Sequence, residues 1–220
     1  MTAVDAERDA VIRGLHRSTP DVQCKFEVHL AGVGPASAAA STARIVATSP
    51  FDLVISTGIG GGFKDHANIG SLVIADQVIA ADLGAEHPQD IFTSVDKLGF
   101  GSSVIPVHHE LSKRLFDKLS TEEHISVYFG PILTLSTVTG TSRTADILTA
   151  RIPGAAAEAM EGYGVAIAAQ QAGIPVMELR TISNAVGPRQ RELWRVGDAL
   201  QTLEHVFSIL PDLFVEVTTS

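Results

Sequence analysis

Two glutamates interrupt a stretch of small and aliphatic residues, and they are the first candidates for chemistry. Glu158 and Glu161 lie three positions apart in PGAAAEAMEGYGVAIAAQQAG, residues 153–173. This stretch is predicted to be a helix, partly buried near Met160 and Val165, which would place both acids on similar faces. Because a buried carboxylate is costly unless something pairs with it or uses it, one of the two acids is a functional candidate.

Glu7 and Asn184 are polar residues at the ends of predicted elements, and each has a plain structural explanation. Glu7 lies in the first turn of a predicted helix, where a carboxylate complements the helix dipole by about 0.3–1 kcal/mol. Asn184 follows a predicted strand, close to Gly187 and Pro188, where an amide commonly forms a turn or caps a helix. Neither position indicates catalysis by itself.

The glycine-rich stretch STGIGGGF, residues 56–63, follows an apolar strand. Phe63 stands where a dinucleotide-binding fingerprint needs its third glycine, and no Gly-Lys-Ser/Thr follows, so both phosphate-binding motifs are excluded. Two interpretations remain: a tight turn, or a bare backbone that a flat ring can approach closely. The eight histidines lack metal-ligand spacing and there is no Gly-x-Ser-x-Gly, so we expect no metal, no cofactor and no serine hydrolase.

The composition is that of a packed α/β protein, with 45% hydrophobic residues, 19% charged residues and a net charge of −9. No Lys/Arg cluster is present, which argues against a nucleic-acid surface. Cys24 is the only cysteine, so no internal disulfide can form. No leader and no apolar run long enough for a bilayer are recognised, so a cytoplasmic protein without membrane association is expected.

Strands and helices alternate along the chain, which favours one α/β domain over residues 1–220 with a parallel or mixed sheet. In such sheets ligands gather at the carboxyl ends of strands. That rule directs attention to Gly58–Gly62, Val138–Thr141 and Asn184–Gly187. The predicted helices are Asp5–His16, 35–49, 153–173 and 191–214, and the predicted strands lie within 24–34, 51–63, 71–82, 126–140 and 174–187.

Several of these stretches together resemble the nucleoside phosphorylase and nucleosidase superfamily. They are TAVDAE, STGIGGGF, EAMEGYGVA and LRTISNAVG, and the resemblance extends over nearly the whole chain, from the first of them to the last. Within the superfamily the stretches TAVDAERDAVIRGL, ADLGAE and TVTGTSRTADIL are similar to the futalosine hydrolases of menaquinone biosynthesis. The resemblance implies a three-layer α/β/α sandwich around a mixed, partly barrel-like sheet, and assembly as a homo-oligomer.

The same resemblance implies roles for single residues. Glu7 would orient and deprotonate the attacking water, and Glu161, beside Met160, would hold the ribose hydroxyls and favour a positively charged sugar. Arg180 would support this centre. Gly60 and Gly61 would lie against the ribose and base, and Val138 and Thr139 would pack on the purine.

Asn184 is an amide where the adenine-cleaving nucleosidases carry an aspartate. An amide can donate to O6 of hypoxanthine and accept from a protonated N7, whereas a 6-amino group needs the opposite pairing. The resemblance therefore implies a purine nucleoside substrate with a 6-oxopurine base, released as hypoxanthine with Asn184 selecting it. The alternatives are an adenine-releasing nucleosidase, a purine nucleoside phosphorylase and a non-catalytic nucleoside-binding protein.

The phosphorylases hold phosphate with arginines and with a Ser or Thr after the glycine loop. Hydrolysis is favoured over phosphorolysis, because STGIGGGF offers no arginine, its glycines replace that hydroxyl, and Glu7 would repel phosphate. Two departures from the family are present. The chain begins directly before Thr2, where the family has a full first strand, so a shortened sheet edge near Glu7 is expected. The group that binds the 5′ carboxylate is not identified; Arg143, Arg189, Arg191 and a neighbouring subunit's loop around Phe100 are candidates.

Overall fold

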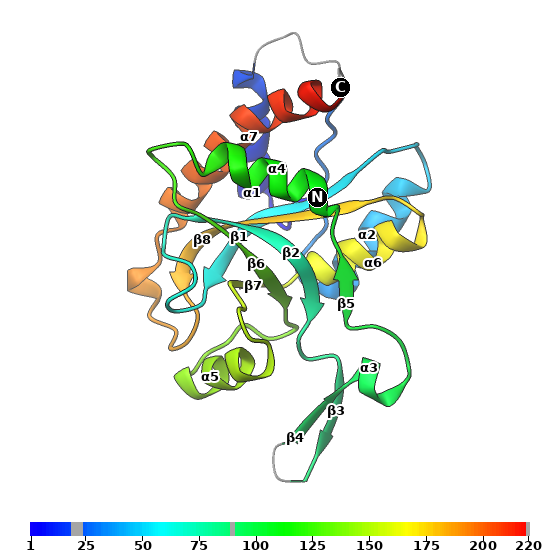
Figure 1. The fold of residues 1–220 in the computed structure, drawn as a ribbon, viewed down its shortest axis with the longest axis vertical. Coiled ribbons are helices and arrows are strands. Elements are labelled where there is room, and N and C mark those ends of the chain that lie inside the picture. Colours follow the sequence, from blue (N-terminus) through cyan, green and yellow to red (C-terminus); the bar gives the residue numbers. More distant parts are fainter. Residues whose placement is uncertain (19–23, 89–90, 219–220) are drawn as a thin grey trace.

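A computed structural model describes residues 1–18, 24–88 and 91–218 of the chain. Its centre is a six-stranded sheet in the order β5-β2-β6-β7-β1-β8, and an additional pairing of β2 with β8 closes the last five into a barrel-like ring (Figure 1). The strands are β1 (Val54–Gly62), β2 (Leu72–Ala80), β5 (Val104–Pro106), β6 (Val127–Thr134), β7 (Ala157–Ala159) and β8 (Val176–Ala185).

The sheet is mixed, as predicted. Strand β1 runs parallel to β8, and β6 runs parallel to both β2 and β7. The pairings β1–β7, β2–β8 and β2–β5 are antiparallel. The predicted fold class, helices around a mixed and partly barrel-like sheet, is therefore confirmed.

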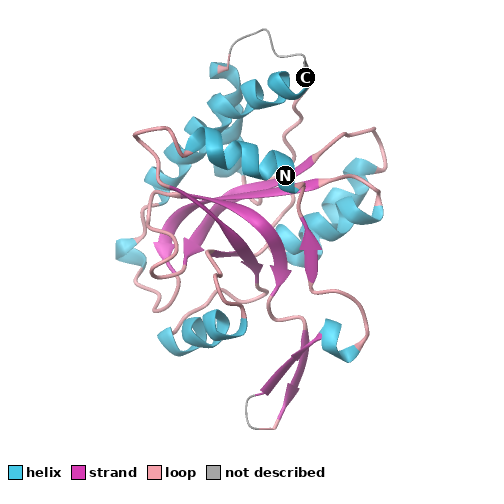
Figure 2. Cartoon of the chain, in the orientation of Figure 1, coloured by secondary structure: helices cyan, strands magenta, loops and turns pink. Residues whose placement is uncertain are grey.

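Helices cover the sheet in separate groups (Figure 2). Helix α1 (Asp5–Arg17) packs along α7 (Val196–Thr218), and α2 (Pro35–Val46) packs along α6 (Gly162–Gln171). Helix α4 (His109–Leu119) contacts β2 and β6, and α5 (Ser142–Arg151) lies on another side. The hairpin of β3 (Gly84–His87) and β4 (Ile91–Ser94), with the short α3 (Val95–Leu98), extends away from the sheet (Figure 1).

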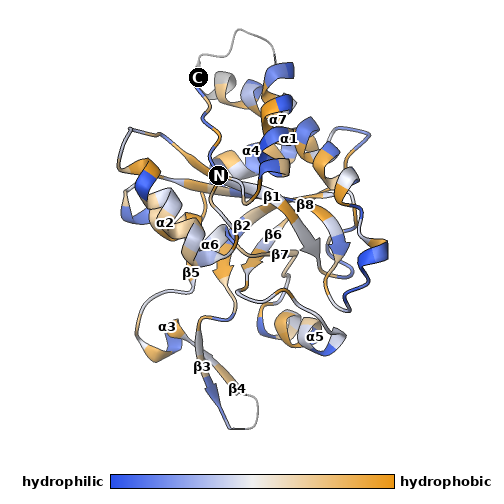
Figure 3. Ribbon diagram, turned by 180° about the vertical axis from the view of Figure 1, so that it is seen from behind, coloured by the Kyte–Doolittle hydropathy of each residue, from blue (hydrophilic) through white to orange (hydrophobic). Residues whose placement is uncertain are grey.

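The core follows the helical and strand periodicities that the sequence displays. Leu203, Val206 and Phe207 on α7 pack with Leu72 and Ile74 of β2 in one buried cluster. In Figure 3, where hydrophobic residues are orange and hydrophilic residues are blue, both colours occur along the helices and strands β2 and β6 are largely orange. The helix predicted over residues 191–214 begins later, at Val196; residues 191–193 form a 3-10 turn, and Leu193 and Val196 are exposed.

Three predicted elements differ from the structure. The first half of the predicted helix over residues 153–173 is wrong: Ala157–Ala159 form β7 between β1 and β6, and α6 begins at Gly162. Pairing on both sides overrides the helical preference of the alanines. The glycines of residues 58–62 belong to β1 instead of a turn. The predicted strand in residues 24–34 makes only one bridge, Leu30 with Thr2.

The first two residues lie between two extended segments. Thr2 N–H donates to His29 O at 3.0 Å, and Thr57 N–H donates to Met1 O at 2.9 Å. A cavity of about 660 Å³ opens beside Met1 between residues 24–28 and 49–55. Its lining contains none of Glu7, Glu161 or Asn184, so it is separate from the polar centre described next.

Candidate active site

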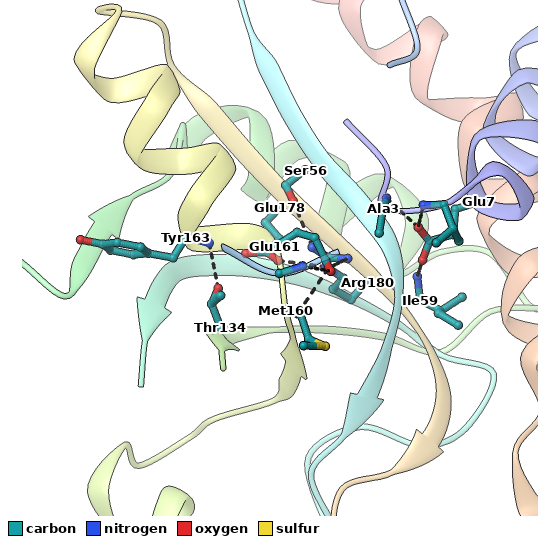
Figure 4. A network of polar contacts seen from close by, with 12 residues as sticks. Ala3, Glu7, Ser56, Ile59, Thr134, Met160, Glu161, Tyr163, Glu178 and Arg180 are labelled. Carbon is teal, nitrogen blue, oxygen red and sulfur yellow. Dashed lines mark hydrogen bonds and ion pairs between the residues drawn. The ribbon is translucent and has the colours of Figure 1, made fainter. Parts of the chain in front are cut away.

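The polar centre forms where β1 and β8 run side by side. The parallel register pairs Ser56 with Glu178 and Gly58 with Arg180, so Arg180 faces a strand segment without a side chain. Helix α1 brings Glu7 to this position, and the β7–α6 junction brings Glu161 (Figure 4). The structure thus brings together Glu7, Glu161 and Arg180, which lie 173 positions apart in sequence at the extremes.

Glu7 is held by backbone N–H groups on both of its oxygens. Oε2 accepts from Ala3 N at 2.8 Å and Val4 N at 3.3 Å, and Oε1 accepts from Ile59 N at 2.9 Å. A Cβ on Gly58 would lie 2.4 Å from Oε1, so only glycine lets the carboxylate approach β1. Glu7 lies in the first turn of α1 as predicted, and its bond to the Val4 N–H also caps the helix, so these bonds fix the carboxylate in place.

Arg180 joins three polar side chains in the interior. Its Nη1 lies 3.3 Å from Glu161 Oε2, its Nε lies 2.9 Å from Glu178 Oε1, and Nη2 donates to Ser56 Oγ at 3.0 Å. The guanidinium side chain is only 1% exposed. Burial opposes its charge, but the facing carboxylates of Glu178 and Glu161 raise the pKa of Arg180 above its usual value.

Glu161 is the residue just before α6, and its carboxylate bonds to the centre instead of capping the helix. Its Oε1 accepts from Gly34 N at 3.2 Å, and its Oε2 accepts from Met160 N at 3.3 Å besides the Arg180 contact. Three donors thus orient a carboxylate that is almost fully buried. Of the two acids singled out in the sequence, Glu161 is the one that joins this centre, and Met160 lies directly beside it (Figure 4).

Glu178 belongs to the centre but was not among the predicted site residues. It is fully buried, and a Cβ on Gly162 would lie 2.2 Å from its oxygens, so the start of α6 packs directly on the carboxylate. Burial raises the pKa of Glu178 to about 7, against the opposing charge of Arg180. The signal that could have found it is the spacing of Glu178 and Arg180, two apart on one face of a strand.

Asn184 and Gly61 are neighbours at the carboxyl end of β1 and β8. Asn184 Oδ1 accepts from Ser183 Oγ at 2.8 Å, and Nδ2 donates to Ala185 O at 3.0 Å. Gly61 pairs with Asn184, and a Cβ on Gly61 would lie 3.3 Å from Nδ2. Gly60 lies beside the aliphatic part of Arg180: a Cβ added to Gly60 would lie 3.4 Å from Arg180 Cβ.

Val138 and Thr139 lie on the segment that follows β6. Thr139 is buried, and its N–H donates to Glu158 Oε1 at 3.0 Å. Val138 is half-buried. This segment meets β7 at Glu158, next to the strand that carries Gly61.

The described residues offer neither a metal-binding cluster nor a membrane-spanning helix. Residues 1–18, 24–88 and 91–218 contain no group of three His, Cys, Asp or Glu side chains that could hold a metal ion. Over the same residues, none of the helices is both long and apolar enough to cross a bilayer.

The substitution Glu178→Gln is expected to remove a pH dependence of stability. A folded pKa of about 7, raised from 4.5, means that this group's contribution is complete below pH 4.5 and lost as the pH rises through 7. Relative to wild type, the amide variant therefore gains stability from pH 5 to pH 8, by at most about 3 kcal/mol. Urea unfolding at several pH values measures this, with Glu110→Gln on the exposed start of α4 as control. Parallel stability curves for wild type and Glu178→Gln would contradict it.

Comparison with known proteins adds three findings. Residues 13–215 match the family model of the phosphorylase superfamily. The chain is 48% identical to a futalosine hydrolase of Streptomyces coelicolor, covering 92% of this chain and 89% of that protein. It is 45% identical to a futalosine hydrolase of Acidothermus cellulolyticus, covering 96% and 88%.

The fold also matches a solved structure. A 5′-methylthioadenosine/S-adenosylhomocysteine nucleosidase from Helicobacter pylori, crystallised with butyl-thio-DADMe-Immucillin-A, superimposes with a TM-score of 0.74. The match covers 98% of this chain and 96% of that structure at 18% identity, which supports the architecture.

Proposed function

We propose that this chain, which belongs to the phosphorylase superfamily, is a futalosine hydrolase of menaquinone biosynthesis: it hydrolyses the N-glycosidic bond of futalosine and releases hypoxanthine and dehypoxanthine futalosine. The observation that carries the proposal is the pair of buried, backbone-held carboxylates, Glu7 and Glu161, beside Arg180. Two fixed carboxylates of this kind suit a reaction in which one activates water and the other faces a developing cation.

The two carboxylates divide the reaction between them. Glycosidic cleavage leaves an oxocarbenium-like sugar, and water must attack it as the base departs. Glu7 accepts three backbone hydrogen bonds, and a carboxylate has about four lone-pair sites, so Oε1 retains one for the attacking water. Glu161 accepts hydrogen bonds from the ribose hydroxyls and stabilises the positively charged sugar. Arg180 orients Glu161 by donating to its Oε2.

The charge of the centre favours water over phosphate as the nucleophile. Arg180 already contacts Glu161, Glu178 and Ser56, so each of its three nitrogens is engaged by a group of the protein. With Glu7 included, three carboxyl groups surround this guanidinium, an arrangement that disfavours an incoming anion. The proposed reaction is therefore hydrolysis.

The hydrogen bonds of Asn184 support a role in reading a 6-oxopurine, because they leave one donor and one lone pair of the amide available. One hydrogen of Nδ2 is used by Ala185 O, and the second can donate to O6 of hypoxanthine. Oδ1 accepts from Ser183 Oγ and keeps a second lone pair for a protonated N7. The base would lie over Gly60 and Gly61, with Met160 toward the ribose and Val138 and Thr139 on the far side.

We expect base release from futalosine alone, independent of phosphate. The assay compares futalosine, inosine and methylthioadenosine, each with and without phosphate, and identifies the released base. Strict dependence on phosphate would assign a phosphorylase, and adenine release from methylthioadenosine would assign the adenine-cleaving nucleosidase. Binding without turnover of any of the three would assign a nucleoside-binding protein.

The substitution Asn184→Asp is expected to shift the base preference toward adenine. A protonated aspartate donates to N7 and accepts from a 6-amino group, while O6 of hypoxanthine then faces an oxygen. Hypoxanthine release from futalosine should fall by about 10- to 100-fold and adenine release from methylthioadenosine should rise. Asn68→Asp, at an exposed position that bonds Tyr128, is the matched control. Unchanged preference in Asn184→Asp would remove Asn184 from base recognition.

A cytoplasmic homo-oligomer is also part of the proposal. Phe100 follows α3 and is 83% exposed, which is unusual for a large aromatic side chain and supports burial by a second copy. Such a copy could complete the 5′ pocket. Arg189, one of the candidate partners of the 5′ carboxylate, lies over the Trp194 ring at 5.5 Å. Analytical ultracentrifugation of wild type and Phe100→Ser tests the assembly.

A further inference from the structure

Glu158 is a buried acid that the proposed mechanism leaves without a role. It lies on β7 and pairs with Gly61 of β1, and Gly61 in turn pairs with Asn184 of β8. Glu158, Gly61 and Asn184 therefore form one row across three adjacent strands. A Cβ on Gly61 would lie 3.5 Å from Glu158 Cγ and 3.3 Å from Asn184 Nδ2, so both side chains flank the same bare spot.

The width of this row suits a purine edge. Neighbouring strands lie about 4.8 Å apart, so the outer two backbones are separated by about 10 Å. That span accommodates a planar base above Gly61 with a hydrogen bond to each side. Asn184, as proposed above, meets the N7 and O6 edge, and the next ring atom beyond O6 is N1.

Two polar atoms on the Glu158 side have no partner within the protein. Glu158 Oε2 and Thr139 Oγ1 are buried and make no hydrogen bond within residues 1–18, 24–88 and 91–218. The two residues are joined by the Thr139 N–H bond to Glu158 Oε1, so the unpaired atoms belong to one cluster. Leaving such atoms unpaired is costly, and a polar ligand group that pairs with them removes the cost.

We propose that Glu158 reads N1 of the base: its carboxylate accepts the N1–H of a 6-oxopurine from the side opposite Asn184. The assignment rests on the proposed function and deepens it. Hypoxanthine carries a hydrogen on N1, whereas adenine presents a lone pair there, which a carboxylate opposes. Selection of hypoxanthine then comes from two residues on opposite sides of Gly61.

The raised pKa of Glu158 is consistent with a carboxylate whose Oε2 has no hydrogen-bond donor among the described residues and gains one when the base binds. Burial raises the pKa of Glu158, and the nearby Thr139 hydroxyl and the Thr139 N–H only partly oppose this effect. An N–H from the base would be a second donor to the ionised form. The alternative role is purely structural, in which Glu158 anchors the segment around Thr139 and touches no substrate.

The substitution Glu158→Gln separates the two roles because the amide has a fixed orientation. Thr139 N–H requires an acceptor, so the amide oxygen replaces Oε1 and the NH₂ group replaces Oε2. A donor then faces N1, which matches adenine and opposes hypoxanthine. The hypoxanthine-over-adenine affinity ratio should fall by about 100-fold, with Glu110→Gln as an unchanged control.

Calorimetric titration with the free bases measures this ratio without requiring turnover. Wild type should bind 1-methylhypoxanthine at least about 10-fold more weakly than hypoxanthine, a comparison that needs no variant. Equal loss for hypoxanthine and adenine in Glu158→Gln, or equal wild-type affinity for the methylated base, would overturn the assignment. Absence of futalosine turnover with retained N1 discrimination would overturn the proposed function instead.

Discussion

Glu7→Gln lowers kcat for futalosine hydrolysis by about 10²- to 10⁴-fold and leaves the affinity for hypoxanthine within about threefold of wild type. The amide cannot take a proton from water, so the attack loses its general base. Because Glu7 lies against Gly58, whereas the proposed position of the base is over Gly61, base binding should be retained. Rapid-quench kinetics with futalosine measures the chemical step directly.

A loss of folding must be separated from a loss of chemistry in this variant. Both oxygens of Glu7 accept backbone N–H bonds, so an amide in either orientation places its NH₂ against a donor. We expect Glu7→Gln to lose about 1–3 kcal/mol of unfolding free energy for this reason. Urea unfolding and hypoxanthine calorimetry on the same preparation provide the control. A folded, base-binding variant with wild-type kcat would show that another group activates the water.

The strongly patterned elements were predicted from the sequence with small errors at their ends. Helix α1 was expected over Asp5–His16 and spans Asp5–Arg17, and β8 lies within its predicted range. The strand β7 was missed because three residues of Ala-Glu-Ala have no periodicity to read, and their pairing partners lie far away in sequence. The local sequence pattern cannot predict a strand whose formation depends on pairing with strands distant in sequence.

In the site, too, the sequence explains single residues locally but does not show which residues distant strand pairing brings together. Glu7 and Asn184 each had an adequate local explanation. Glu7 does lie in the first turn of α1, whereas Asn184, expected to form a turn or cap a helix, lies within β8 and bonds its neighbours Ser183 and Ala185. Their convergence depends on the β1–β8 register, which places Gly58 beside Arg180 and Gly61 beside Asn184. Only the family resemblance suggested that convergence from sequence. Glu178 was missed because its partner Arg180 was interpreted alone.

Arg180→Met is expected to produce the largest loss of stability of any single substitution proposed for this chain. Methionine fills much of the space but leaves Glu161 and Glu178 buried without their shared cation. Breaking a buried pair from one side typically costs about 3–5 kcal/mol, because the remaining charge is uncompensated. Urea unfolding at pH 8 measures the loss, and Arg8→Met at the half-exposed start of α1 is the matched control.

The pH dependence identifies the cause of that loss. The pKa of Glu178 is already raised to about 7, and removing the Arg180 charge, which lowers it, raises it further. Glu178 is then neutral at pH 5 and needs no cation, so Arg180→Met should lose less stability at pH 5 than at pH 8. The double variant with Glu178→Gln should recover part of the loss at pH 8. An equal loss at both pH values would mean that packing of the guanidinium stem, instead of charge pairing, is what Arg180 contributes to the fold.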